Sequence, residues 1–252
     1  MQKDKKTSKN EKTTFKEWFK DNAKALFWAL LIALTVRSCA FEPFNIPSGS
    51  MIPTLLVGDY LFVNKASYGY SRYSFPFGMP IVSGRVFYSE PKRGDIVVFR
   101  LPPHPSVDYI KRVIGLPGDR IQVKDGILHI NGQPVKRTFK KIVLEERMGV
   151  NVPHALYDEE LPNGLVHEIL EVSDSEPKDN TIEYIVPPDH FFMMGDNRDN
   201  SQDSRFLDKV GYVPKENLVG KAQFMFYSHE QSLFSDFGKG IRWNRMFKKV
   251  GP

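Results

Sequence analysis

Cysteine and metal-binding patterns are nearly absent from this chain of 252 residues. The single cysteine, Cys39, excludes an intramolecular disulfide and any cysteine-based metal site. The six histidines are scattered, without a spacing such as His-Glu-x-x-His, and each is better explained as a surface or packing residue. They are His104, His129, His154, His167, His190 and His229. We therefore predict no metal site and no cofactor.

Two further features of the sequence narrow the class of protein. No Gly-x-Ser-x-Gly elbow occurs, so the nucleophile arrangement of the α/β-hydrolases is not indicated. The net charge is +5, but residues 1–24 hold eight lysines against four acidic residues, so the remainder is near neutral. This distribution favours a membrane-side anchor over a nucleic-acid surface, and we expect no nucleic-acid partner.

Long apolar runs are missing except for one, Ala25–Val36, which lies between Lys24 and Arg37. Twelve residues fall short of the roughly 20 that cross a bilayer, so a cleaved signal peptide and a buried helix both compete with a span. Lys24 and Arg37 can extend their charges outward, however, and residues 38–41 lengthen the apolar stretch.

A small-x-small cleavage site is missing directly after the apolar run, because Arg37 interrupts it and Phe41-Glu42-Pro43 follows. We therefore favour an uncleaved anchor over residues 25–41. The basic tail, residues 1–24, would stay in the cytoplasm, and residues 42–252 would lie on the outer side of the membrane.

The stretch from Pro47 to Pro53 holds Ser48, Gly49 and Ser50 between its two prolines. Because proline fixes φ and glycine frees it, this stretch predicts a rigid irregular loop. Such a loop can hold a nucleophilic hydroxyl exposed, although a simple turn between two strands is the favoured interpretation when the stretch is taken alone.

Lys111 lies in a predicted strand, residues 108–114, between Tyr109 and Val113 on the same face. Burial without a counter-charge lowers the pKa of a lysine, and a neutral amine can act as a general base. A cross-strand salt bridge or a surface lysine is the plainer alternative. Strands are also predicted at residues 60–64 and 96–100, and Asp125-Gly126 predicts a hairpin.

Residues 131–186 change in character and are charged and mixed. We interpret them as an inserted subdomain with short strands, and find no chemistry in them. Two other stretches leave alternatives open. The aromatic segment 68–80 is either a loop packed on its own rings or a surface against lipid. The basic and aromatic tail, residues 241–249, either contacts acidic lipid or forms a docked terminal helix.

The last dense stretch, Gly195–Arg205, follows an apolar strand and is rich in acids, amides, serines and arginines. Calcium binding is rejected, because Arg198 stands where a ligand should be and the glycine precedes the acids. We predict a self-contained network of Asp/Arg pairs, with Ser201 and Ser204 as additional hydroxyls.

Four stretches together resemble the successive boxes of bacterial type I signal peptidases, in the order found in that family. They are Pro47–Asp59, Lys92–Phe99, Tyr109–Asp119 and Gly195–Arg205. The resemblance covers roughly residues 36–123 and 185–227 and is weak across the insert and the N-terminal tail. It implies a mostly β, antiparallel-sheet domain with an inserted β subdomain at about 131–186 and one N-terminal transmembrane helix.

The resemblance also implies the activity and the location of the protein. It would be an endopeptidase with a Ser/Lys dyad that removes signal peptides from exported preproteins, after an Ala-x-Ala-like motif. It would be anchored by a single pass in the bacterial inner membrane, with its catalytic domain in the periplasm. We expect a monomer whose partners are preproteins and the lipid bilayer.

Carried over by position, the resemblance assigns a role to each site residue. Ser50 would be the nucleophile, Lys111 its general base, Ser201 the residue that orients the lysine, and Ser48 a donor to the oxyanion. The substrate pockets would be lined by Phe44, Ile46, Met51, Leu55, Leu61, Val98, Tyr109 and Ile110. The loop beneath the dyad would be held by Asp196, Arg198, Asp203 and Arg205.

Two rival functions use the same residues. A related Ser/Lys protease that cleaves itself or a repressor would be soluble and cytosolic. A membrane-tethered β domain that has lost catalysis would bind partners only, although the presence of both Ser50 and Lys111 counts against it.

Overall fold

A computed structural model describes residues 15–75, 78–147, 150–230 and 240–251. Most of the predicted tail, residues 1–24, therefore lies outside the described residues. The chain divides into two compact units, Met1–Arg37 and Ser38–Pro252, which are described separately.

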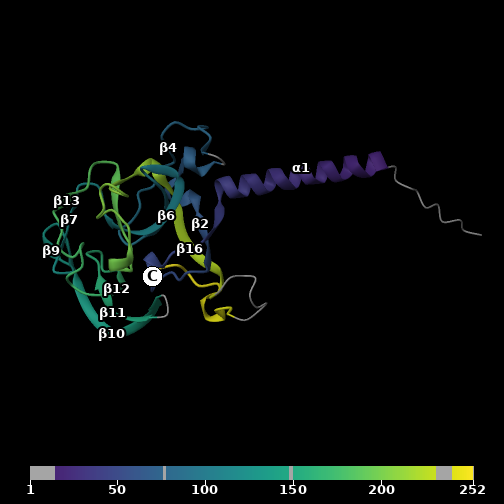
Figure 1. The fold of residues 1–252 in the computed structure, drawn as a ribbon. Helices are drawn as coiled ribbons and strands as arrows, with labels where there is room; N and C mark the ends of the chain where they lie inside the picture. Colours follow the sequence, from purple (N-terminus) through teal and green to yellow (C-terminus); the bar gives the residue numbers. More distant parts are fainter. Residues whose placement is uncertain (1–14, 76–77, 148–149, 231–239, 252) are drawn as a thin grey trace, which may run out of the picture. The chain divides into compact units, whose positions relative to one another are not determined.

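The described part of the first unit belongs to helix α1, which spans Phe15–Cys39, ends two residues into the second unit and is the only α-helix of the described residues (Figure 1). It contains no proline or glycine, and the alanines and leucines that fill it are strong helix formers. Its large apolar side chains are exposed, including Leu26, Phe27 and Leu30. None of the described helices combines the length and the apolar composition that a bilayer-crossing helix needs.

The second unit is built on antiparallel sheets, and the largest sheet among the described residues has seven strands. In order across the sheet these are β1 (Phe41–Asn45), β2 (Asp59–Asn64), β16 (Leu218–Ser228), β5 (Ile96–Leu101), β6 (His104–Gly115), β14 (His190–Met194) and β15 (Val213–Pro214). The predicted strands at 60–64, 96–100 and 108–114 are confirmed as β2, β5 and β6. The prediction of a mostly β, antiparallel domain is likewise confirmed.

A four-stranded sheet follows β6 in the chain. Across it lie β13 (Tyr184–Ile185), β7 (Arg120–Lys124), β8 (Ile127–Ile130) and β9 (Gln133–Pro134). The predicted hairpin at Asp125-Gly126 is confirmed between β7 and β8. Both turn residues have positive φ, 48° and 73°, which is the backbone conformation that an Asp-Gly hairpin turn requires.

The inserted segment forms a three-stranded sheet of β10 (Lys136–Arg147), β11 (Val150–Glu160) and β12 (Val166–Glu171). The prediction of short strands here is wrong for β10 and β11, which have 12 and 11 residues, whereas β12 has six. Charged residues on both faces of these strands remove the alternation of apolar and polar residues by which a strand is predicted from sequence. Figure 1 shows β10–β12 together on the opposite side of this unit from β2 and β16.

Two smaller features complete the second unit. Strands β3 (Tyr70–Ser71) and β4 (Arg85–Val86) pair within the aromatic region. Tyr68 of the predicted 68–80 loop is only 2% exposed and donates a hydrogen bond to Asp95 Oδ2 (2.9 Å), whereas residues 76–77 lie outside the described residues.

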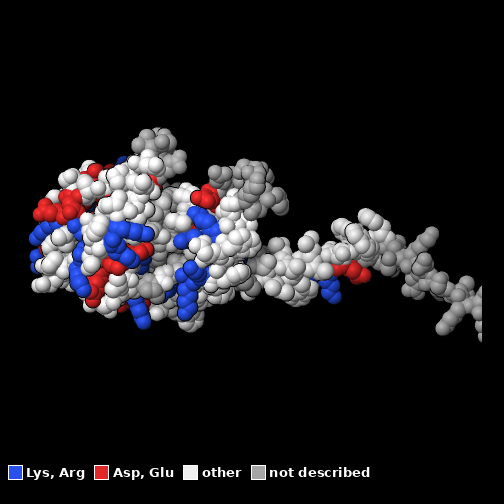
Figure 2. Space-filling model, turned by 90° about the horizontal axis from the view of Figure 1, so that it is seen from below, with Lys and Arg blue, Asp and Glu red and all other residues white. Residues whose placement is uncertain are grey.

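The C-terminal stretch does not form the docked helix that was one alternative. Its described part has a single 3-10 turn at Trp243–Arg245. Arg245 pairs with the buried Asp59 at 2.6 Å, so this stretch is fixed by ionic contact. On the face of the second unit visible in Figure 2, basic and acidic side chains lie interspersed, so charge there is of mixed sign.

Candidate active site

Ser50 lies in a short 3-10 turn, Gly49–Met51, which follows strand β1 and Pro47 in the chain. The turn closes with a hydrogen bond from Ile52 N–H to Gly49 C=O (3.1 Å), so it does not use the N–H of Ser50. Ser48 precedes the turn without capping it, and its Oγ lies 3.4 Å from Ser50 Oγ. A Cβ at Gly49 would lie 3.0 Å from Ile52 Cδ1, so glycine lets this turn pack tightly.

Lys111 reaches this serine from strand β6. Its Nζ donates a hydrogen bond to Ser50 Oγ at 2.6 Å and another to the carbonyl of Ile110 at 3.0 Å. Ser50 is 8% exposed and Lys111 only 4%. The structure therefore brings together the two side chains that the sequence marked separately.

The charge state of Lys111 follows from its surroundings. Burial lowers the pKa of its amine to about 8, although the carboxylates of Asp203 and Asp196 act in the opposite direction. Near pH 8 a large fraction of this amine is neutral, and a neutral amine 2.6 Å from a hydroxyl can accept its proton.

The loop after strand β14 holds the backbone of Ser50. Asn197 donates twice, from its N–H to the Ser50 carbonyl and from Nδ2 to the Gly49 carbonyl, both at 3.1 Å. A Cβ at Gly195 would lie 2.5 Å from the Ser50 carbonyl oxygen and 2.2 Å from Ser201 Oγ. This close approach requires glycine at position 195.

Ser201 is buried against Gly195, close to the Ser50 backbone. In the part of the chain that the structure describes, no hydrogen bond joins Ser201 Oγ to Lys111 Nζ. The structure thus places this serine beside Ser50 but not hydrogen-bonded to the amine of Lys111.

Asp203 and Arg205 form the pair that was predicted inside the loop. Arg205 Nε lies 2.9 Å from Asp203 Oδ1, and Asp203 Oδ2 accepts a hydrogen bond from Gly195 N–H at 3.0 Å. Burial acts to raise the pKa of Asp203, but Arg205 outweighs it and holds that pKa below its ordinary value.

The prediction of a self-contained loop is wrong for its other three charged residues, Asp196, Arg198 and Asp199. Asp199 Oδ2 accepts a hydrogen bond from Val172 N–H at 2.6 Å. Asp196 is bound by Arg112 of strand β6 at 2.8 and 2.6 Å, and Arg198 pairs with Glu159 of strand β11. The physical reason is that the inserted sheet packs directly against the loop, which the local sequence does not reveal. Leu170 N–H of β12 also donates to the Asp196 carbonyl at 2.8 Å.

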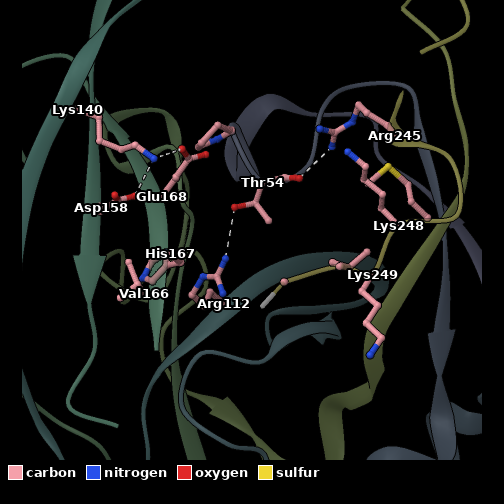
Figure 3. Close-up of a pocket in the computed structure, with 14 residues that line it drawn as sticks. Thr54, Arg112, Lys140, Asp158, Val166, His167, Glu168, Arg245, Lys248 and Lys249 are labelled. Carbon is pink, nitrogen blue, oxygen red and sulfur yellow. Dashed lines mark hydrogen bonds and ion pairs between the residues drawn. The ribbon is translucent and has the colours of Figure 1, made fainter. Parts of the chain in front are cut away.

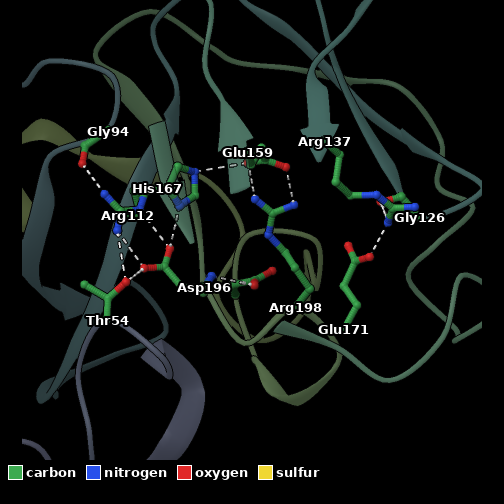
Figure 4. Close-up of polar contacts among 12 residues, drawn as sticks. Thr54, Gly94, Arg112, Gly126, Arg137, Glu159, His167, Glu171, Asp196 and Arg198 are labelled. Atoms are coloured by element: carbon green, nitrogen blue, oxygen red, sulfur yellow. Dashed lines mark hydrogen bonds and ion pairs between the residues drawn. The ribbon is translucent and has the colours of Figure 1, made fainter. Parts of the chain in front are cut away.

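The four charges form one buried network around His167, which is drawn in Figure 4. Burial acts to raise the pKa of Glu159, but Arg198 and His167 outweigh it and lower that pKa to about 2. Burial also acts to raise the pKa of Asp196, while Arg112 holds it far below its ordinary range. Both carboxylates are therefore ionised at every pH at which the protein would work.

The comparison with known proteins decides the family. The sequence model of the family described as signal peptidase, peptidase S26, matches residues 16–227. The chain belongs to the signal peptidase, peptidase S26, family. The predicted resemblance is confirmed, and the chain is a peptidase.

Relatives support this assignment over nearly the whole length. The signal peptidase I of Rickettsia canadensis is 41% identical over 271 residues, which cover 99% of this chain and 98% of the relative. That of Rickettsia typhi is 41% identical over 244 residues, covering 88% and 90%. A crystal structure of a signal peptidase I from Enterococcus faecalis V583 is 25% identical, covers 53% of this chain and 97% of that chain, and has a TM-score of 0.30.

Most of the predicted pocket residues of this peptidase share one apolar cluster. The predicted pocket residues that belong to this cluster are Phe44, Ile46, Met51, Leu55, Leu61, Val98 and Ile110. Tyr109 packs in a separate cluster with Phe99 and Val113, and its hydroxyl donates to Gln202 Oε1 at 2.9 Å. Because Met51 follows Ser50 directly, the first cluster adjoins the dyad.

A cavity of about 420 Å³ opens over the supporting network, as Figure 3 shows. Its wall includes Thr54, Arg112 and His167, together with Lys140 and the C-terminal lysines Lys248 and Lys249. The network is therefore reachable from solvent on this side. Among the described residues, no group of three or more His, Cys, Asp or Glu side chains is arranged to hold a metal ion.

The sequence did not single out three residues that touch this site: Asn197, Glu159 and His167. Asn197 lies in the stretch Gly195–Arg205, but nothing in that stretch distinguishes it. Only the structure shows its two contacts with the turn that carries Ser50. Glu159 and His167 lie in the charged insert, where no local pattern distinguishes them from solvent-facing residues.

Proposed function

We propose that this peptidase cleaves N-terminal signal peptides from exported preproteins, after a small-x-small motif. The observation that carries the proposal is the buried contact of 2.6 Å between Lys111 Nζ and Ser50 Oγ. It supplies a nucleophile and a base without a histidine, which is a known variant of the serine triad. The names of the relatives, all signal peptidase I, support the choice of substrate.

In the proposed mechanism, Ser50 Oγ attacks the scissile carbonyl while neutral Lys111 takes the hydroxyl proton. The resulting oxyanion accepts hydrogen bonds from the Ser50 N–H, which the 3-10 turn leaves unused, and from the Ser48 hydroxyl. The protonated Lys111 then gives its proton to the leaving amine, and an acyl-enzyme on Ser50 results. Neutral Lys111 finally deprotonates a water molecule that hydrolyses the ester.

The supporting residues act by position. Asn197 fixes the carbonyls of Gly49 and Ser50, and thereby the direction of Ser50 Oγ. Asp196, Arg198, Asp203 and Arg205 hold the loop that carries Asn197. We propose that Ser201 contributes by filling the space between Gly195 and the dyad.

Selection of small side chains would come from the apolar cluster beside Ser50. Its walls are the buried side chains of Ile46, Met51, Leu55, Leu61 and Val98, with Phe44 and Ile110 partly buried at its margin. Tyr109 would border the site from its own cluster. A shallow apolar pocket accepts alanine and excludes larger side chains by overlap.

We also propose that residues 25–41 anchor the protein in the bacterial inner membrane, with residues 1–24 cytoplasmic and residues 42–252 periplasmic. The exposed apolar side chains of α1 support this, since such a surface is unfavourable in water. Extraction of membranes with alkaline carbonate tests the proposal: an anchored chain stays in the pellet, and release to the supernatant would contradict it.

The decisive test of the activity is cleavage of a preprotein by purified full-length protein in detergent. Ser50→Ala and Lys111→Ala should each lower kcat by at least about 10²–10⁴-fold, the range that general-base catalysis supplies. The matched controls Ser175→Ala and Lys209→Ala change exposed residues and should leave the rate unchanged. Wild-type cleavage by both Ser50→Ala and Lys111→Ala would refute the dyad.

A further inference from the structure

Strand β12 of the inserted sheet holds the active-site loop at two points. Its Leu170 N–H donates to the Asp196 carbonyl at 2.8 Å, and its His167 side chain reaches the Asp196 carboxylate. The insert, which has no evident chemistry in the sequence, therefore forms one wall of the loop that supports Ser50.

His167 lies between two carboxylates. Its Nδ1 is 3.5 Å from Asp196 Oδ1, and its Nε2 is 3.1 Å from Glu159 Oε2. The residue is only 5% exposed, so these contacts form in a setting with little competing water. Each carboxylate is also bound by an arginine, Arg112 for Asp196 and Arg198 for Glu159.

Asp196 connects His167 to the dyad through the next residue in the chain. Asn197 follows Asp196 and donates to both the Ser50 and the Gly49 carbonyls. Thr54, four residues after Ser50, donates to Asp196 Oδ2 at 2.5 Å. A shift of the Asp196 carboxylate is thus transmitted to the turn that carries Ser50 from both sides.

We propose that His167 is a positioning residue for the Ser50–Lys111 dyad, which holds Asp196 in place from the side of the inserted sheet. The proposal rests on the proposed function, because it assigns His167 a role in that reaction. It gives the insert a part in catalysis without any contact to the substrate.

The charges around His167 agree with this role. Burial and Arg112 act to lower the pKa of its imidazole, but the contacts with Asp196 and Glu159 outweigh them and raise that pKa above its ordinary value. An imidazolium can donate to both carboxylates at once. Lys140 also lines the cavity, and it pairs with Asp158 at 3.2 Å and with Glu168 at 2.8 Å. The remaining charged residues of the cavity wall are Arg245, Lys248 and Lys249.

Two amide substitutions separate the two contacts of His167. The amide nitrogen of His167→Asn takes approximately the place of Nδ1, which lies 3.5 Å from Asp196 Oδ1 in an ion-pair contact without a hydrogen bond, and so keeps an N–H group facing Asp196. That of His167→Gln takes approximately the place of Nε2 and retains a donor to Glu159 only. If His167 acts through Asp196, His167→Asn keeps kcat close to wild type, whereas His167→Gln lowers it by about 10–10²-fold with KM unchanged, as expected for misplacement by up to 1 Å.

The experiment measures kcat and KM of the full-length protein in detergent, with a preprotein as substrate. Each kcat is divided by the folded fraction of the protein, which is taken from unfolding curves recorded by tryptophan fluorescence. His129→Gln is the matched control, because this half-buried histidine lies in another sheet, where its Nδ1 is 3.0 Å from the Ile127 carbonyl. Equal losses in both His167 variants, no loss in either, or a rise in KM in place of the fall in kcat would each overturn the proposal.

The outcome is separable from failure of the proposed function. If Ser50→Ala and Lys111→Ala abolish cleavage while the two His167 variants behave like His129→Gln, only the role of His167 is refuted. If Ser50→Ala still cleaves, the proposed function itself is refuted.

Discussion

Lys111 and Arg112 are neighbours on strand β6, and both are buried, yet their surroundings are opposite. Lys111 contacts a hydroxyl and a carbonyl, and no carboxylate of the described residues lies within hydrogen-bonding distance of its amine. Arg112 meets the carboxylate of Asp196 with two of its nitrogens, at 2.8 and 2.6 Å, and the Gly94 carbonyl at 2.8 Å. Because side chains alternate along a strand, the two cations serve opposite faces of β6.

The difference shows how one strand produces both a base and a support. Burial without a bound counter-charge lowers the pKa of Lys111 to about 8, so its proton is available for exchange. The buried Arg112, in contrast, contacts the Asp196 carboxylate with two of its nitrogens and thereby fixes the loop. Substitution of Lys111 should therefore change the rate of cleavage, and loss of the ion pair between Arg112 and Asp196 should lower the free energy of unfolding.

The largest effect is expected for Asp196→Asn. It leaves the buried guanidinium of Arg112 without its counter-charge, and breaking a buried ion pair in this way costs about 3–5 kcal/mol. The free energy of unfolding, measured by urea titration of the full-length protein, should fall by this amount. An unfolding free energy equal to that of the wild type would show that the network does not stabilise the fold.

A smaller effect, on kcat and not on stability, is expected for Ser48→Ala. It removes one proposed donor to the oxyanion, and such donors are worth about 10²–10³-fold in kcat. Stability should stay within about 0.5 kcal/mol of the wild type, because Ser48 is exposed and caps nothing. Equal kcat for Ser48→Ala and wild type would remove Ser48 from the oxyanion site.

The smallest effect, on the free energy of unfolding, is expected for Asp108→Asn, on the same strand as Lys111 and Arg112. Asp108 pairs with Arg100 at 3.2 Å, with side chains 32% and 24% exposed. Surface pairs of this kind contribute about 0–1 kcal/mol, and solvent screening places this one at the low end. A loss as large as that of Asp196→Asn would mean that burial does not distinguish the two pairs.

The sequence predicted the reactive residues, Ser50 and Lys111, better than the ion pairs that support them. Ser50 lies in a loop set by nearby prolines and a glycine, and Lys111 lies in a strand with a clear alternation. These are local signals, and they were sufficient to predict strands β2, β5 and β6.

The supporting ion pairs depend on contacts that no local pattern encodes. Asp196 is 84 residues from Arg112, and Arg198 is 39 residues from Glu159. Strands β10 and β11 carry charges on both faces, so their length and their contact with the loop were missed. His167 stands among those charges without a distinguishing neighbour.

The most direct test of the account is the pH dependence of kcat/KM for preprotein cleavage, which reports the pKa of the essential base in the free enzyme. Since the pKa of Lys111 lies at about 8, below that of a free lysine, the neutral base is lost as pH falls through this value. We predict that kcat/KM rises with pH through one group of pKa about 8 and then levels off. A flat profile across this range, or a rise that continues without levelling towards the ordinary pKa of a lysine, would contradict the assignment of Lys111 as the base.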